Sequence, residues 1–130
     1  MAVIKDITVD QGTNHIEGFT LESLTDTSLP YDEITNPYLL LDLAAATIRM
    51  QVRSTIDASS IMLTATDANG KFIKTTSGSF ELHLLPLDTS AMRFSGEEAN
   101  YVYDIELELP GPVTIRPVQG AFNVIREVTR

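Results

Sequence analysis

Alternation between apolar and polar residues is the feature of this sequence that most constrains its fold. Residues 103–109 (YDIELEL) place four apolar side chains on one side of an extended chain and three acids on the other. Residues 48–53 (IRMQVR) and 80–84 (FELHL) follow the same two-residue period. Because successive side chains of a strand point to opposite faces, this period predicts antiparallel strands with one buried and one solvated face.

Turn signals separate these segments from further apolar runs that also have strand character. The Asn-Gly pair in residues 67–70 (DANG) predicts a hairpin turn, since both residues readily adopt positive φ. Gly120 is expected at a bulge or a close packing contact. A single helical turn with Asp88 as its cap is expected over residues 86–92. The remaining strands are expected at residues 3–9, 15–21, 61–66, 71–75, 113–117 and 121–128.

Many short strands at this spacing are typical of a sandwich or a barrel. The length of 130 residues suits one domain. We therefore expect residues 1–130 to form a single all-β domain, an immunoglobulin-like antiparallel β-sandwich with one short helical turn. Tyr101 and Tyr103 begin the strand that such folds often tie to the backbone through a tyrosine hydroxyl.

Composition narrows the class of protein. Hydrophobic residues make up 43% and charged residues 21% of the chain, as in folded domains. The absence of cysteine excludes disulfides and thiolate chemistry. The net charge of −9 makes nucleic acids and anionic membrane surfaces unfavourable partners. No stretch approaches the roughly 18 apolar residues of a membrane span, and residues 1–10 do not resemble a signal peptide.

Residue types that carry chemistry do not form a recognisable motif. His15 and His83 are too few for a zinc site without cysteine, and no G-x-S-x-G nucleophile motif or phosphate-binding glycine loop is present. The three acids of residues 103–109 are explained as a solvated strand face, which Arg49 and Arg53 could meet across strands. We expect no catalytic residue, no cofactor and no metal.

The longest segment without a strand pattern is residues 25–38 (TDTSLPYDEITNPY). Its prolines, hydroxyl residues and acids predict a long exposed loop, and such loops are often functional. We expect partner contact here, through Tyr31, Asp32, Glu33 and Tyr38. Asp32 and Glu33 would also suit calcium with ligands from elsewhere. Tyr31 and Tyr38 are the aromatic residues on which a carbohydrate-binding module, the rival class of function, would depend.

Both ends of the chain are candidates for contact with a partner. The N-terminal segment is expected to be a docking arm. The last strand, at residues 122–128, could lie at a sheet edge and pair with another chain. However, Phe122 and Val124 predict that this strand belongs to the core.

A series of strand and turn segments in the second half of the chain carries a family resemblance. The most specific are residues 103–107 (YDIEL) and 127–130 (EVTR). The others are residues 50–53 (MQVR), 78–82 (GSFEL), 88–89 (DT) and 118–124 (VQGAFNV). Over residues 45–130 the chain resembles small virion structural proteins of tailed bacteriophages. It is similar, more loosely, to the N-terminal immunoglobulin-like domain of phage baseplate upper proteins.

The resemblance implies a β-sandwich without catalytic residues that serves as an adaptor in the tail, baseplate or neck of the particle. It implies other phage structural proteins as partners, several copies around a symmetry axis, and a place in the virion after assembly in the host cytoplasm. A capsid decoration protein is the alternative within the same class. The first forty residues, with the acidic loop, lie outside the resemblance.

Overall fold

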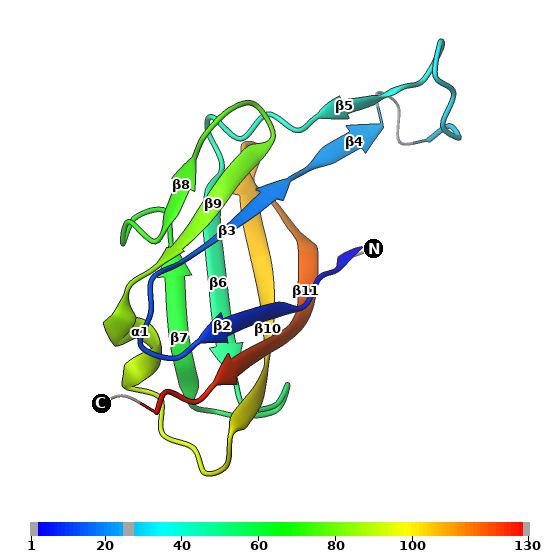
Figure 1. Ribbon diagram of the computed structural model, residues 1–130. Coiled ribbons are helices and arrows are strands. Elements are labelled where there is room, and N and C mark those ends of the chain that lie inside the picture. Colours follow the sequence, from blue (N-terminus) through cyan, green and yellow to red (C-terminus); the bar gives the residue numbers. More distant parts are fainter. Residues whose placement is uncertain (1–2, 25–27, 129–130) are drawn as a thin grey trace.

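The chain folds into two facing β-sheets with one short helix and a projecting two-stranded arm (Figure 1). We describe it from a computed structural model that covers residues 3–24 and 28–128, without the side chains of residues 23, 24 and 38. Its helix is α1 (Pro86–Ser90). Its strands are β1 (Val3–Ile4), β2 (Ile7–Asp10), β3 (His15–Thr20), β4 (Glu22–Leu24), β5 (Tyr38–Leu40), β6 (Thr47–Arg53), β7 (Ile61–Thr66), β8 (Phe72–Lys74), β9 (Ser79–Leu84), β10 (Glu98–Leu109) and β11 (Val113–Ile125).

Sheet order identifies the type of sandwich. The large sheet has the order β1-β11-β10-β6-β7, with β2 also paired to β11, and the small sheet has the order β3-β9-β8. In immunoglobulin lettering, β3 is strand B, and β6 to β11 are strands C, C′, D, E, F and G in chain order. The large sheet then contains strands G, F, C and C′, and the small sheet contains strands B, E and D. This is the division found in immunoglobulin variable-type domains. The expected all-β, immunoglobulin-like sandwich with one short helix is confirmed.

The alternating segments supply the core between the two sheets. In β10, Ile105 and Leu107 have no exposed surface, while the alternating acids Asp104, Glu106 and Glu108 lie on the opposite face. Phe80 of β9 stacks on Phe19 of β3 at a centroid distance of 5.1 Å and meets Phe72 of β8 edge-on at 5.5 Å. Each ring comes from a different strand of the small sheet, so this aromatic cluster holds its three strands together.

The two strands expected at the C-terminal end are one continuous strand, β11. It lies between β10 and the N-terminal strands, inside the large sheet. The idea that it sits at an edge and pairs with another chain is therefore wrong. Phe122 and Val124 are fully buried, as predicted.

The N-terminal segment is part of the sandwich and not a docking arm. Both β1 and β2 pair in parallel with β11. Ile7 and Val9 are 1% and 0% exposed. The expectation of a free arm is wrong because these side chains complete the core, and releasing them would expose it to water.

Between β1 and β2 the chain crosses directly over Gly120. A Cβ on Gly120 would collide with the carbonyl oxygen of Lys5, which confirms the close packing expected at this glycine. The same carbonyl accepts a hydrogen bond from the Tyr103 hydroxyl at 2.5 Å. Burial, with the charges of Glu17 and Asp6, raises the pKa of Tyr103, so its hydroxyl remains a donor.

A second connection joins the end of β2 to α1 and to the C-terminal segment. Gln11 is 9% exposed, and its Nε2 donates to the carbonyls of Thr89 and Met92 at 3.2 and 3.1 Å. Its Oε1 accepts the N–H of Glu127 at 3.2 Å. The last carbonyls of a helix have no partner within it. Gln11 therefore provides partners for carbonyls at this end of α1 from a distant part of the chain.

The turn at residues 67–70 connects the two sheets and is not a hairpin. β7 belongs to the large sheet, whereas β8 belongs to the small one. Gly70 has the expected positive φ, at 82°, whereas Asn69 does not. The local turn prediction is therefore correct, but the pairing of the flanking strands is wrong. The turn signal does not specify which sheet the next strand joins.

The side chain of Asn69 closes part of the outer edge of β7. Its Oδ1 accepts the N–H of Thr66 at 3.0 Å, and its Nδ2 donates to the carbonyl of Thr64 at 3.1 Å. A neighbouring strand would supply the same two kinds of bond. These two backbone groups of β7 are therefore not available for pairing with another strand.

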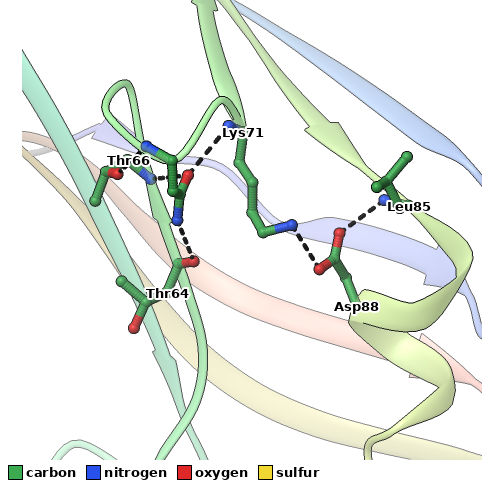
Figure 2. Close-up of polar contacts among 6 residues, drawn as sticks. Thr64, Thr66, Lys71, Leu85 and Asp88 are labelled. Carbon is green, nitrogen blue, oxygen red and sulfur yellow. Dashed lines mark hydrogen bonds and ion pairs between the residues drawn. The ribbon is translucent and has the colours of Figure 1, made fainter.

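An ion pair attaches the same turn to α1, as Figure 2 shows. Asp88 Oδ1 lies 2.6 Å from Lys71 Nζ, and Asp88 Oδ2 accepts the N–H of Leu85 at 2.7 Å. The prediction that Asp88 is the cap of the helix is wrong, because the N-cap is Leu85; Asp88 lies at the third helical position, and its carboxylate reaches back to the N-cap N–H.

Replacing Tyr103 tests the connection between the N-terminal segment and the large sheet. Tyr103→Phe leaves the Lys5 carbonyl without this partner, so we expect the free energy of unfolding to fall by about 1–2 kcal/mol. Tyr101→Phe is the matched control. The Tyr101 hydroxyl is buried and makes no hydrogen bond among the described residues, so its loss should change little. Urea denaturation of both variants measures the difference, and equal losses would contradict this account.

Replacing Asn69 tests how the edge of β7 is protected. Asn69→Ala removes both bonds to the strand. We expect the free energy of unfolding to fall by about 1–3 kcal/mol and the tendency to aggregate to rise. Asn69→Asp keeps an acceptor for Thr66 and loses only the donor to Thr64, so its loss should be smaller. Thermal unfolding with light scattering compares the two. An Asn69→Ala protein as stable as the parent would show that the edge needs no such partner.

Candidate docking site

The segment predicted to contact a partner is an arm that projects beyond the end of the sandwich (Figure 1). The arm comprises residues 22–40, in which β4 pairs with β5. Its base rests on the turn before β9, where the N–H of Leu21 donates to the carbonyl of Gly78 at 2.7 Å. Gly78 has a φ of 74°, and a Cβ there would lie 2.8 Å from the Leu21 carbonyl oxygen. Both facts require glycine at position 78. The β4–β5 pair holds the two ends of the expected loop together.

A tight turn over residues 32–36 forms the tip of the arm. The N–H and C=O of Asp32 pair with the C=O and N–H of Asn36 at 3.0 and 2.8 Å. Oδ1 of Asp32 accepts the N–H groups of Ile34 and Thr35 at 2.9 and 3.0 Å. Asn36 is 3% exposed, and its Nδ2 donates to two backbone carbonyls of the preceding segment at 3.1 and 2.9 Å. The hydrogen bonds of the arm itself therefore set the shape of the tip.

The structure brings three of the four predicted contact residues together at this tip. Tyr31 is 52% exposed, and Glu33 is exposed. Asp32 is exposed as well, but its carboxylate is engaged in the turn. The backbone of Tyr38 lies in β5, and its side chain lies outside the described residues.

Ile34 is an exposed apolar residue of the tip that the sequence pattern did not single out. Its side chain is 85% exposed, immediately after the acids of the tip. A β-branched apolar residue between turn-forming residues was the available signal, because such a residue has no core to join at the end of an arm. The large apolar side chains of the arm that are about half exposed or more are Leu29, Tyr31, Ile34, Leu39 and Leu40.

Charge gives the arm a second property. Between Lys5 and Arg49 the sequence contains no Lys or Arg, so every fixed charge on the arm is negative. Contiguous exposed apolar groups mark interaction surfaces, and complementary charge directs which surface is met. The arm therefore combines exposed apolar side chains with fixed charges of one sign.

The histidines are accounted for by neighbouring carboxylates. His15 Nε2 lies 2.8 Å from Glu17 Oε1, and His83 Nε2 lies 3.0 Å from Glu81 Oε1. Lys5 Nζ lies 3.1 Å from the other oxygen of Glu17. Among residues 3–24 and 28–128, no three His, Asp or Glu side chains are grouped so that they could hold a metal ion.

Two of the three strand-face acids are also paired. Glu106 meets Arg49 at 3.0 Å across β10 and β6, as predicted. Asp104 meets Arg116 of β11 at 3.0 Å. The expected role of Arg53 is wrong, because its guanidinium donates to the carbonyls at residues 58 and 59 and to the Gln51 side chain. None of these contacts assembles an acid and a base around a reacting position.

Helix α1, the one helix in the described part of the chain, is too short to cross a membrane.

No family model matches the chain, and no curated protein matches it. Solved structures that are similar to it include murine CRIg, with 8% identity, a TM-score of 0.33, and coverage of 94% of this chain and 92% of that one. Another is Drosophila OTK, extracellular domains 3–5, with 14% identity, a TM-score of 0.33, and coverage of 94% and 32%. At this level of likeness neither protein informs the partners of this chain.

Titration of Asp32 tests the tip of the arm. Hydrogen bonds from the backbone of Thr35 and Ile34 lower the pKa of this carboxyl. Because the pKa is lowered in the folded state, the ionised carboxylate stabilises the turn fully at a pH above its usual pKa of about 3.9. This stabilisation is lost as the pH falls through the lowered pKa. We expect the amide NMR signals of Ile34 and Thr35 to shift together below that usual value. Asp32→Asn keeps an acceptor and should remove the pH dependence, whereas a transition at the ordinary value would contradict the assignment.

Proposed function

We propose that this chain is a non-enzymatic structural protein of a tailed bacteriophage virion, an adaptor of the tail, baseplate or neck that docks on other virion proteins. The observation that carries the docking part of the proposal is the exposed Ile34 on a turn fixed by Asp32 and Asn36. An apolar group held in a defined position loses little conformational freedom on binding, so most of its burial contributes to affinity. The tip of the arm is the binding element.

The virion setting is supported by the sequence resemblance over residues 45–130. An acidic single sandwich with a projecting arm suits a protein that is present in several copies and contacts its neighbours by shape. Nucleic acid and anionic lipid are unfavourable partners for a net charge of −9. The partners are accordingly other structural proteins of the particle, which is assembled in the host cytoplasm.

Immunogold electron microscopy of tailed phage particles, with an antibody against this chain, tests the setting. Label at the tail tip, baseplate or neck is the expected result. Label over the head would replace the adaptor with the alternative, a capsid decoration protein. Particles that carry no label would contradict the virion proposal.

A pair of variants tests the arm. Ile34→Asp places a charge where the partner must supply an apolar surface, and we expect incorporation into particles to fall about tenfold or more. Ile73→Asp is the matched control, because Ile73 is 45% exposed on the small sheet, away from the arm. Quantitative immunoblotting of purified particles measures both. Equal incorporation of the two variants would overturn the role of the tip.

A further inference from the structure

A groove crosses the outer face of the large sheet, opposite to the face that packs on the small sheet. Its volume of about 470 Å³ is in the range of about 300–1,000 Å³ that holds small ligands. Ile4 and Ile56 contribute apolar surface to it, and they are 69% and 85% exposed. Val102 adds a partly buried apolar surface from β10. The groove is thus large enough for an aliphatic side chain together with its neighbour.

A bulge in β11 explains why an arginine lies in this groove. Ile105 pairs with Val118 but Leu107 pairs with Ile115, so two residues of β11 lie opposite one residue of β10. One of these two residues is Pro117, which has no N–H to give to the ladder and is tolerated at bulges. Bulges redirect side chains, and Arg116, the other residue, lines the groove and binds Asp104.

The groove offers one cation without an acidic partner. Its two carboxylates are each paired, Asp104 with Arg116 and Glu106 with Arg49, both at 3.0 Å. Arg53 forms no ion pair among the described residues and donates to two carbonyls and one amide oxygen. A guanidinium has five N–H donors. An incoming carboxylate can therefore use those that remain on Arg53 without breaking an existing ion pair.

We propose that this groove receives the arm tip of a second copy of the same chain. The inference rests on the proposed docking role of the arm and adds the identity of one partner. Ile34 occupies the space between Ile4 and Ile56, and the adjacent Glu33 meets Arg53. The tip is apolar and acidic, the groove is apolar with a spare cation, and both are exposed in the single chain.

The contact is heterologous, because the arm and the groove are different surfaces of the chain. Repetition of such a contact produces a ring if the rotation closes and a filament if it does not. The arm points away from the body of its own chain (Figure 1), which suits contact with a neighbour. An arm-in-groove contact thus provides a route to several copies around a symmetry axis.

Disulfide trapping tests the contact in the intact chain, which has no native cysteine to interfere. Two single variants, Ile34→Cys and Ile56→Cys, are mixed under mild oxidation, with mass tags that distinguish the mixed dimer. Both residues are 85% exposed, so neither change should disturb folding. We expect the mixed dimer to form about tenfold faster than a control mixture of Ile34→Cys and Ile73→Cys, because docking raises the effective concentration of the two thiols.

A second measurement removes the proposed attraction without cysteine chemistry. Glu33→Arg should lower self-association in sedimentation equilibrium, and Thr35→Arg, which changes charge by one unit at the same tip, is the control for added positive charge. Equal trapping rates in both mixtures, or a parent chain that remains monomeric under trapping conditions, would overturn the arm-in-groove contact. If that happens while Ile34→Asp still fails to enter particles, docking of the arm on another protein stands and only this inference falls.

Discussion

The hydrogen bond from the Tyr103 hydroxyl to the Lys5 carbonyl is the interaction that fixes the N-terminal edge of the large sheet. It forms where the N-terminal segment crosses Gly120, the point at which any Cβ would block the chain. On one side of this crossing β1 pairs with β11, and on the other side β2 does. The small residue permits the crossing, and the buried hydroxyl fixes it. The short strands β1 and β2 therefore form one edge of the sheet, and Ile7 and Val9 of β2 lie in the core.

The same segment limits where a partner can attach. Lys5 donates through Nζ to the carbonyl of Gly18 at 2.7 Å, which places a charged side chain on the outer edge of β3. Asn69 provides partners for part of the edge of β7, and β11 is flanked by β1 at residues 118–119 and by β2 at residues 122–125. Natural sheets use charged residues and side-chain caps of this kind to avoid edge-to-edge pairing. The arm and the groove, in contrast, combine exposed apolar groups with charge, which suits them to specific contact.

The fold was largely predictable because it depends on a short-range pattern. The alternation of residues 103–109 identifies the central strand and its buried face, and a period of two specifies both without reference to the rest of the chain. The helical turn expected over residues 86–92 was predictable for a similar local reason, although its N-cap is Leu85 and not Asp88. Errors arose where a distant residue decides the outcome. The free N-terminal arm was wrong because Tyr103 and β11 hold that segment, and the hairpin at residues 67–70 was wrong because sheet membership is a non-local property.

The candidate site shows the same division between local and distant causes. Turn-forming residues placed an exposed acidic segment near Asp32, and the structure has one there. Sequence did not show that Asn36 would be buried beneath the tip or that Ile34 would be presented outward, since both follow from the folding of the arm onto itself. The groove was not foreseeable at all. It needs the bulge that turns Arg116 outward and the approach of Ile4 and Ile56, which lie far apart in sequence.

Replacement of residues 25–37 by a short glycine-containing turn tests most directly the claim that a finished sandwich carries a separate docking arm. The free energy of unfolding of the shortened chain and its binding to particles assembled without this protein are measured together. The account predicts a stability within about 1 kcal/mol of the parent, as for changes outside the core, and loss of binding to the particles. A shortened chain that unfolds, or one that binds the particles as well as the parent does, would contradict it.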